Sequence, residues 1–321
     1  MRAALASPRA ARPATTIVRA LSTAPRAPRV ADGETLDVLG ASKLRVVQSK
    51  VGYRTGVDAL ALAWFARRSR GDVESFADRA CDLGAGSSGA VGLAYALSGA
   101  RPARATFVEA QRDSCERLRR SVETNARASD AFDVVLGDVV EDARALLDDR
   151  KMRRAFDVVL TNPPFFEATR GTPPKNKEKK GARFGILEDG GAATIHDFIG
   201  FAKEALREDG EFFVVYPSLG RARLLAAMVA AFGDDAVRAT DVFDHEGASR
   251  PSLVFARATL RGYSGDAVET SCALYQRRRA RFTRRRAWER GSGRTWIRLR
   301  CFFNASRRPA SACEECCNKL Q

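Results

Sequence analysis

Residues 77–97, ADRACDLGAGSSGAVGLAYAL, form the stretch that decides the fold. Ala77–Leu83 is predicted to be a buried strand, and Gly89–Leu97 is predicted to be a helix. Glycines in the turn between them permit a sharp change of direction and let the backbone approach a ligand closely. A helix that begins directly after such a turn offers free N–H groups to that ligand. The stretch therefore predicts a strand, a ligand-binding turn and a helix.

The same alternation continues along the chain. Strands are expected at Arg104–Glu109, Asp133–Gly137, Phe156–Thr161 and Glu211–Tyr216, and helices near Asp113–Ala126, Asp197–Arg207 and Arg221–Phe232. Two last strands, near Ala236–Asp244 and Pro251–Thr259, have no helix-length spacer between them and should pair antiparallel. The predicted fold class is α/β, a Rossmann-like seven-stranded, mostly parallel sheet with helices on both faces and an antiparallel final strand pair. Ligands of such sheets bind beyond the carboxyl ends of the strands.

Charge is distributed unevenly along the 321 residues. The formal net charge is +15, but residues 1–31 hold six arginines and no acid, and residues 277–321 have a net charge of +11. Residues 32–276 are left with −2, so the overall basicity says little about a substrate. The seven cysteines are odd in number and scattered, which does not indicate a disulfide framework. His196 has no Cys or His partner at metal-ligand spacing, so no metal is predicted.

Acidic residues end three successive predicted strands. Asp82 ends the first, Glu109 follows twenty residues after Gly89, and Asp138 ends the third. An acid in the position of Glu109 accepts hydrogen bonds from ribose hydroxyls, and Asp138 is placed to accept one from an adenine amino group. Carboxylates would repel a pyrophosphate, so the set favours an adenosine-containing ligand with a positive centre. The turn glycines expected to bind it are Gly84, Gly86 and Gly89.

Asn162-Pro163-Pro164-Phe165 directly follows the strand Phe156–Thr161, where two prolines end any sheet ladder. An exocyclic amine is a poor nucleophile, because its lone pair is conjugated into the ring. The Asn162 side-chain oxygen and the Pro163 carbonyl, held rigid by the prolines, are predicted to accept its two N–H groups. Phe165 is expected to stack on the base.

Four motifs, in this order, resemble the class I S-adenosylmethionine-dependent methyltransferases: Asp-Leu-Gly-Ala-Gly, Val-Glu-Ala, Gly-Asp-Val and Asn-Pro-Pro-Phe. The stretch from Gln48 to Leu62, with Val-Val-Tyr-Pro-Ser downstream, is similar to the bacterial valine-tRNA adenine-N6 methyltransferases over residues 35–262. The resemblance implies S-adenosylmethionine as cofactor and places Thr55, Gly56 and Asp58 against it. An extra Ser separates Gly86 from the third glycine, which leaves open which of the two faces the methionine part of the cofactor.

Substrate identity rests on the loop after the Asn-Pro-Pro-Phe motif. Phe166 is expected to pack behind the stacking ring, and basic residues of the loop are expected to reach RNA phosphates. These are Lys175, Lys177, Lys179, Lys180 and Arg183. The motif alone does not choose its amine, so tRNA adenine-N6 methylation stands beside three alternatives: an rRNA amine, a protein glutamine, or a non-catalytic RNA-binding scaffold.

The expected domain organisation has three parts. Residues 1–31, rich in Arg, Ala, Ser and Pro, resemble a disordered organelle transit peptide, which would direct the protein to a mitochondrion or chloroplast; an uncleaved segment would leave it cytoplasmic. Residues 32–262 form the predicted methyltransferase domain, and residues 263–321 a basic, partly disordered extension. No run of about 18 apolar residues indicates a membrane-spanning helix.

Overall fold

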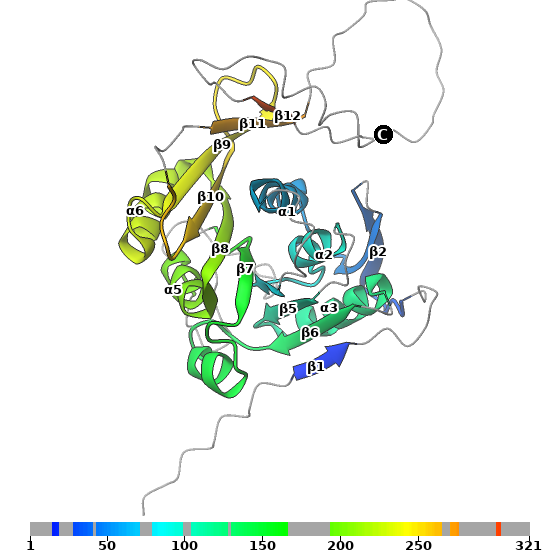
Figure 1. The fold of residues 1–321 in the computed structure, drawn as a ribbon. Helices are drawn as coiled ribbons and strands as arrows, with labels where there is room; N and C mark the ends of the chain where they lie inside the picture. Colours follow the sequence, from blue (N-terminus) through cyan, green and yellow to red (C-terminus); the bar gives the residue numbers. More distant parts are fainter. Residues whose placement is uncertain are drawn as a thin grey trace, which may run out of the picture.

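The computed structural model describes residues 15–18, 28–40, 43–70, 79–98, 104–127, 130–165, 193–264, 270–275 and 300–302. Within these residues ten strands form one sheet in the order β1-β6-β5-β4-β7-β8-β10-β9-β11-β12 (Figure 1). The strands are β1 (Thr15–Val18), β4 (Arg79–Leu83), β5 (Arg104–Glu109), β6 (Ala131–Leu136), β7 (Phe156–Thr161), β8 (Leu206–Pro217), β9 (Val237–His245), β10 (Leu253–Thr259), β11 (Thr270–Tyr275) and β12 (Arg300–Phe302).

The predicted seven-stranded arrangement is confirmed by the strands β4 to β10. β6, β5, β4, β7 and β8 run parallel, and β10 pairs antiparallel with both β8 and β9. The strand order reverses at β4, since β5 lies on one side of it and β7 on the other. In open α/β sheets this reversal creates a crevice at the carboxyl ends of the strands.

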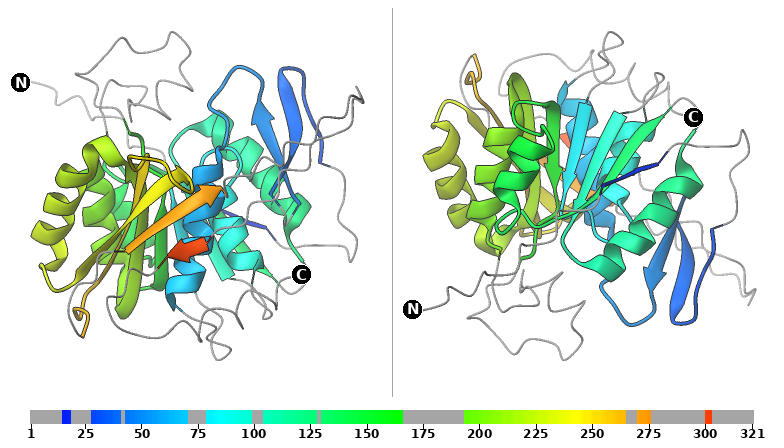
Figure 2. Two further views of the ribbon diagram at one scale, coloured as in Figure 1. Left: turned by 90° about the horizontal axis from the view of Figure 1, so that it is seen from above. Right: turned by 90° about the horizontal axis from the view of Figure 1, so that it is seen from below.

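Helices cover both faces of the sheet, as expected. α1 (Val57–Arg70), α2 (Ala90–Leu97) and α3 (Arg112–Asn125) lie on one face, and α5 (Ile195–Ala205) and α6 (Arg221–Phe232) on the other (Figures 1 and 2). The two faces have separate hydrophobic cores because side chains alternate along each strand. In β8, Phe213 and Val215 belong to the first core, whereas Phe212 and Val214 belong to the second.

A second, two-stranded sheet precedes the first helix and was not predicted. Its strands β2 (Glu34–Leu39) and β3 (Leu44–Ser49) pair antiparallel, and β3 lies against α3. The helix α1 was likewise not predicted. Ala59, Leu62, Phe65 and Ala66 of this helix are buried against the sheet.

Three strands extend the seven-stranded arrangement at its edges. β1 pairs antiparallel with β6 and lies within residues 1–31, the segment expected to be a transit peptide. β11 pairs parallel with β9 and lies beyond the predicted domain end at residue 262, and β12 pairs with β11. None of the described helices combines the length and apolar character needed to cross a membrane.

Candidate functional site

The carboxyl ends of four neighbouring parallel strands bring the predicted site residues to one edge of the sheet. Leu83, the last residue of β4 before the glycine turn, is in register with Val108 of β5 and with Thr161 of β7. The Thr161 hydroxyl donates a hydrogen bond to the Leu83 carbonyl over 2.8 Å, which ties the ends of β4 and β7 together. Asn162 follows directly, so the glycine turn and the Asn-Pro-Pro-Phe motif start side by side.

The three turn glycines face different surroundings, although all have positive φ. Gly84, Gly86 and Gly89 have φ of 68°, 63° and 58°. A Cβ on Gly89 would lie 2.6 Å from a methyl carbon of Leu118 and 3.2 Å from the Phe107 ring, and one on Gly84 would lie 3.2 Å from the ring of Phe198. No atom of the described residues would lie within 4 Å of a Cβ on Gly86. Gly86 is therefore the turn position open to a ligand, and Gly89 serves packing against the core.

Glu109 fixes the conformation of this turn. Its side chain is 5% exposed, and its two carboxylate oxygens accept hydrogen bonds from the backbone N–H groups of Gly86 (2.9 Å) and Gln111 (2.8 Å). A carboxylate oxygen has lone pairs for more than one donor. The acid predicted to bind ribose hydroxyls thus lies directly beside the open glycine.

Asp138 lies two residues after the end of β6, close to the strand end where it was expected. Its Oδ1 atom accepts hydrogen bonds from the backbone N–H groups of Val140 (2.7 Å) and Glu141 (3.1 Å), and its own N–H donates to Asp142. Burial raises the pKa of the Asp138 carboxyl above its ordinary value. The backbone N–H groups of Val140 and Glu141 therefore fix the orientation of the Asp138 carboxyl group.

Asp82 has surroundings unlike those of the other two acids. Its side chain is 2% exposed and lies under α2, where Oδ2 accepts a hydrogen bond from the Gly92 N–H over 2.8 Å. Burial raises the pKa of this carboxyl to about 7. The contact with Gly92 gives Asp82 a role in attaching α2 to β4, which the expectation of a cofactor ligand did not include.

Gly92 is a residue that the sequence analysis missed. A Cβ there would lie 2.6 Å from the Phe107 ring and 2.9 Å from the Cβ of Asp82. Only glycine allows α2 to approach the sheet this closely. The sequence feature that could have indicated this close approach is a fourth glycine, three residues after Gly89 and therefore at helical spacing from it.

Asn162 is half-buried and is held by its amide nitrogen. Nδ2 donates a hydrogen bond to Oδ2 of Asp58 over 2.9 Å, across 104 residues of sequence. Pro163 is buried, Pro164 is half-buried, and no peptide bond in the described residues is cis. The predicted catalytic residues Asn162, Pro163, Pro164 and Phe165 therefore lie together at the sheet edge.

The Phe165 ring packs against Tyr216 of β8. Their ring centroids are 5.7 Å apart at an interplanar angle of 83°, and Arg223 donates to the Tyr216 hydroxyl over 3.2 Å. Tyr216 is buried, so the Phe165 ring packs against a side chain of the core. The predicted RNA-contacting residues lie outside the described residues: Phe166, Lys175, Lys177, Lys179, Lys180 and Arg183.

Residues 48–58, which we name the strap, run from the last two residues of β3 to the first two residues of α1. The Thr55 N–H donates to the Gln48 side-chain oxygen over 2.7 Å, and the Thr55 hydroxyl lies 2.5 Å from the hydroxyl of Ser88 in the glycine turn. A Cβ on Gly56 would lie 2.4 Å from Oδ1 of Asp58, so the carboxylate occupies that space. The strap thus contacts the glycine turn through Thr55 and the Asn-Pro-Pro-Phe motif through Asp58.

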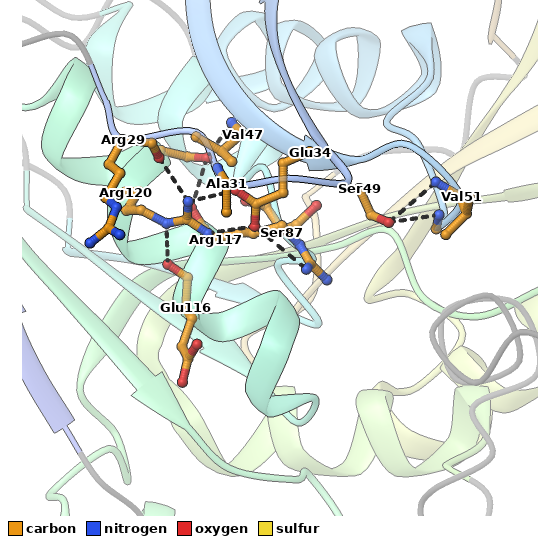
Figure 3. Close-up of polar contacts among 12 residues, drawn as sticks. Arg29, Ala31, Glu34, Val47, Ser49, Val51, Ser87, Glu116, Arg117 and Arg120 are labelled. Atoms are coloured by element: carbon orange, nitrogen blue, oxygen red, sulfur yellow. Dashed lines mark hydrogen bonds and ion pairs between the residues drawn. The ribbon is translucent and has the colours of Figure 1, made fainter.

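The hairpin before the strap is fastened to α3 by an ion-pair cluster (Figure 3). Arg120 donates from its two terminal nitrogens to the two oxygens of Glu34 over 2.6 and 2.7 Å, and Arg117 lies 3.8 Å from the same carboxylate. The hydrogen bonds from Arg120 keep the pKa of Glu34 below its ordinary value. At the end of β3, Ser49 Oγ accepts from the backbone N–H groups of Val51 and Gly52 and shapes the first turn of the strap.

Comparison with known families supports the sequence interpretation over part of the chain. Residues 70–175, about a third of the chain, match the family model described as the methyltransferase small domain. This range contains the glycine turn, the acids at the strand ends and the Asn-Pro-Pro-Phe motif. No curated protein matches the sequence significantly.

Several solved structures have similar chains at low sequence identity. A predicted O-methyltransferase from Agrobacterium tumefaciens is 22% identical, with 70% of this chain and 91% of that chain covered and a TM-score of 0.48. The 16S rRNA N2 guanosine methyltransferase of T. thermophilus, solved with AdoMet and guanosine, is 20% identical; 72% of this chain and 52% of that chain are covered, with a TM-score of 0.47. A putative RNA methyltransferase from Pyrococcus horikoshii is 19% identical, with 64% and 86% covered and a TM-score of 0.38.

Proposed function

We propose that this protein is an S-adenosylmethionine-dependent N-methyltransferase that methylates an amine of an RNA base, most specifically N6 of an adenine in a tRNA anticodon loop. The observation that supports it is the meeting of two sets of groups at one sheet edge. The open glycine, Gly86, lies beside Glu109, and the half-buried amide of Asn162 follows the neighbouring strand. The family match over residues 70–175 covers both sets.

The residues at this edge suit S-adenosylmethionine. Within the part of the chain that the structure describes, no atom lies within 4 Å of a Cβ placed on Gly86, which leaves room for a ligand against the turn. Glu109 would accept hydrogen bonds from the ribose hydroxyls, and Asp138 would accept one from the adenine amino group, as carboxylates at successive strand ends do in nucleotide-binding sheets. Two buried acids also favour a ligand with a positive sulfonium and disfavour a pyrophosphate. When bound, the cofactor supplies an electrophilic methyl group.

The chain's own groups act on the amine. The Asn162 side-chain oxygen and the Pro163 carbonyl each accept one N–H, which turns the nitrogen lone pair out of conjugation. This exposed lone pair is the group that would take up the methyl group supplied by the bound cofactor, and the methylated amine would then release one proton to water. The two prolines hold the acceptors in place, so little reorganisation is needed as positive charge develops on nitrogen.

The substrate class rests on the sequence of the loop after this motif. Five basic residues between 175 and 183 provide charges for RNA phosphates. An anticodon loop presents unstacked bases, so moving one into the site costs less free energy than extracting it from a duplex. Phe165, supported by Tyr216, offers an aromatic ring at the site for such a base.

The first experiment separates an enzyme from a scaffold. Calorimetric titration with S-adenosylmethionine should give binding to the wild-type protein and, with similar affinity, to Asn162→Ala. Methylation of total tRNA by the wild-type protein should yield N6-methyladenosine on nucleoside mass spectrometry, and Asn162→Ala should lose about 100-fold or more of this activity. Absence of cofactor binding at millimolar concentration would support the scaffold alternative, and methylated rRNA or protein glutamine would change the substrate.

The loop is tested by charge removal. Replacing Lys175, Lys177, Lys179 and Lys180 with Ala should raise the Michaelis constant for RNA and flatten its dependence on salt, because fewer counterions are released. A matched control removes four charges from the basic extension: Arg277, Arg278, Arg279 and Arg281. An unchanged salt dependence in the loop variant, with a changed one in the control, would move the RNA contact to the extension.

We also propose an organelle location, based on the composition of residues 1–31. Removal of this segment would take away β1 and leave β6 as an edge strand of the sheet. N-terminal sequencing of the protein isolated from cells tests this directly. A mature N-terminus upstream of Thr15 would contradict removal of the whole segment.

A further inference from the structure

An asparagine that must accept a hydrogen bond from a substrate has two nearly identical orientations. Its amide has an oxygen that accepts and a nitrogen that donates, and rotation by half a turn exchanges them. An amine substrate also presents N–H donors, so the reversed amide would face donor with donor. The active orientation of Asn162 therefore has to be fixed by another group.

Asp58 is the group that the structure places there. Its Oδ2 atom lies 2.9 Å from Nδ2 of Asn162. An ionised carboxylate only accepts hydrogen bonds, so it stabilises the orientation in which the amide nitrogen faces Asp58 and the oxygen faces away. The reversed amide would put two oxygens in contact.

Asp58 is itself held in place. It lies in the first turn of α1, where the helix dipole favours a negative charge. Its Oδ1 occupies the space above Gly56, where any Cβ would lie 2.4 Å away. The preceding residue, Thr55, is bound to Gln48 and Ser88. The position of the carboxylate is thus set by the strap and, through Ser88, by the glycine turn.

We propose that Asp58 is a positioning residue that acts through Asn162: it fixes the side-chain oxygen toward the substrate amine. This proposal rests on the proposed function and changes the role that the sequence analysis gave to Asp58, which was cofactor binding. The negative carboxylate also polarises the amide, so the Asn162 oxygen becomes a stronger acceptor as the amine nitrogen acquires positive charge.

The direct test observes the amide of Asn162 itself. The chain has five asparagines, so a protein labelled with ¹⁵N-asparagine gives a simple side-chain NH₂ spectrum. The Asn162 signals are identified by their loss in Asn162→Ala. In Asp58→Asn, which adds a sixth asparagine, the signals that disappear on the further replacement Asn162→Ala should be shifted and exchange faster with water, because the replacement side chain can donate to the amide oxygen as well as accept. The Asn125 amide, which donates to the carbonyls of Arg45 and Ser121, serves as the internal reference and should not change.

The functional test separates positioning from cofactor binding. Asp58→Asn should lower turnover about 10- to 100-fold, since the Asn162 amide is reversed in a fraction of the molecules and the carboxylate charge is lost. Its dissociation constant for S-adenosylmethionine should stay within about twofold of the wild-type value. Asp113→Asn is the matched control, because Asp113 is an exposed acid in the first turn of α3, a helix as long as α1; its turnover should be unchanged.

The possible results distinguish the two proposals. Unperturbed Asn162 signals in Asp58→Asn would overturn the positioning role, and so would a perturbed signal with normal turnover. Weakened cofactor binding with normal turnover at saturating cofactor would return Asp58 to the cofactor. A wild-type protein that binds S-adenosylmethionine but methylates neither RNA nor protein would overturn the proposed function and the positioning role with it.

Discussion

The buried carboxyl group of Asp82 makes the stability of the fold depend on pH. Its pKa is raised from 3.8 to about 7, mainly because burial disfavours the charged form. A group whose pKa is raised in the folded state binds more protons there than in the unfolded chain. It therefore stabilises the fold at low pH, and this contribution is lost as the pH rises toward the folded pKa.

The size of the effect follows from the shift. A difference of about three pKa units corresponds to about 4 kcal/mol between the fully protonated and fully ionised limits. Between about pH 5 and about pH 8, the free energy of unfolding of the wild-type protein should lose about 2.5 kcal/mol of the contribution from Asp82. The replacement Asp82→Asn keeps an oxygen that can accept from the Gly92 N–H but cannot ionise.

Urea unfolding followed by circular dichroism measures this difference. The free energy of unfolding of Asp82→Asn, relative to wild type, should increase by about 2.5 kcal/mol from about pH 5 to about pH 8. Any fixed cost of placing an amide under α2 is the same at every pH and drops out. The control Asp209→Asn changes an exposed acid in the first part of β8 and should show no such trend. A difference between Asp82→Asn and wild type that stays constant with pH would refute the burial argument.

Two further predictions concern the turn and the hairpin. Gly86→Ala should weaken binding of S-adenosylmethionine in a titration and lower the free energy of unfolding by only about 1 kcal/mol, the cost of placing alanine at a positive φ. Gly89→Ala should lower the free energy of unfolding by more than that, because its Cβ would overlap Leu118. Equal losses of stability in the two variants would contradict the assignment of Gly86 as the open glycine. Glu34→Gln should cost about 2 kcal/mol in urea unfolding near neutral pH, since it removes the charge shared with the partly exposed Arg120. Because the pKa of Glu34 is lowered in the fold, this stabilisation is present above the unfolded pKa and disappears as the pH falls, so wild type and variant should converge in acid.

Strands and helices with strong patterns were predictable from sequence alone. β5, β7 and α6 have the expected bounds, because each combines an uninterrupted apolar pattern with a Gly, Pro or charged boundary. β8 begins earlier than expected, at Leu206, with a register irregularity opposite Phe156 and Val158 that no local pattern indicates. α1 was missed because the stretch was interpreted only through its resemblance, although its alanines and leucines are suited to a buried helix.

The positions of the candidate site residues relative to the strands were predictable, but their contacts were not. The spacing of acids located Asp82, Glu109 and Asp138 at strand ends, but not the face of the sheet on which each side chain lies. Asp82 shares a face with Ala80, two residues away, and this face is covered by α2. The contact of Asp58 with Asn162 joins residues 104 positions apart, and no periodicity in a single sequence indicates such a pair.

The hydrogen bond from Gly86 to Glu109 has a consequence for ligand affinity. The same carboxylate that would recognise a sugar also sets the shape of the turn, through its hydrogen bond from the Gly86 N–H. The conformational entropy of ordering this loop is therefore lost during folding and does not have to be lost again at each binding event. Replacement of Glu109 would remove the proposed contact to the ribose and, in the same step, release the backbone of Gly86.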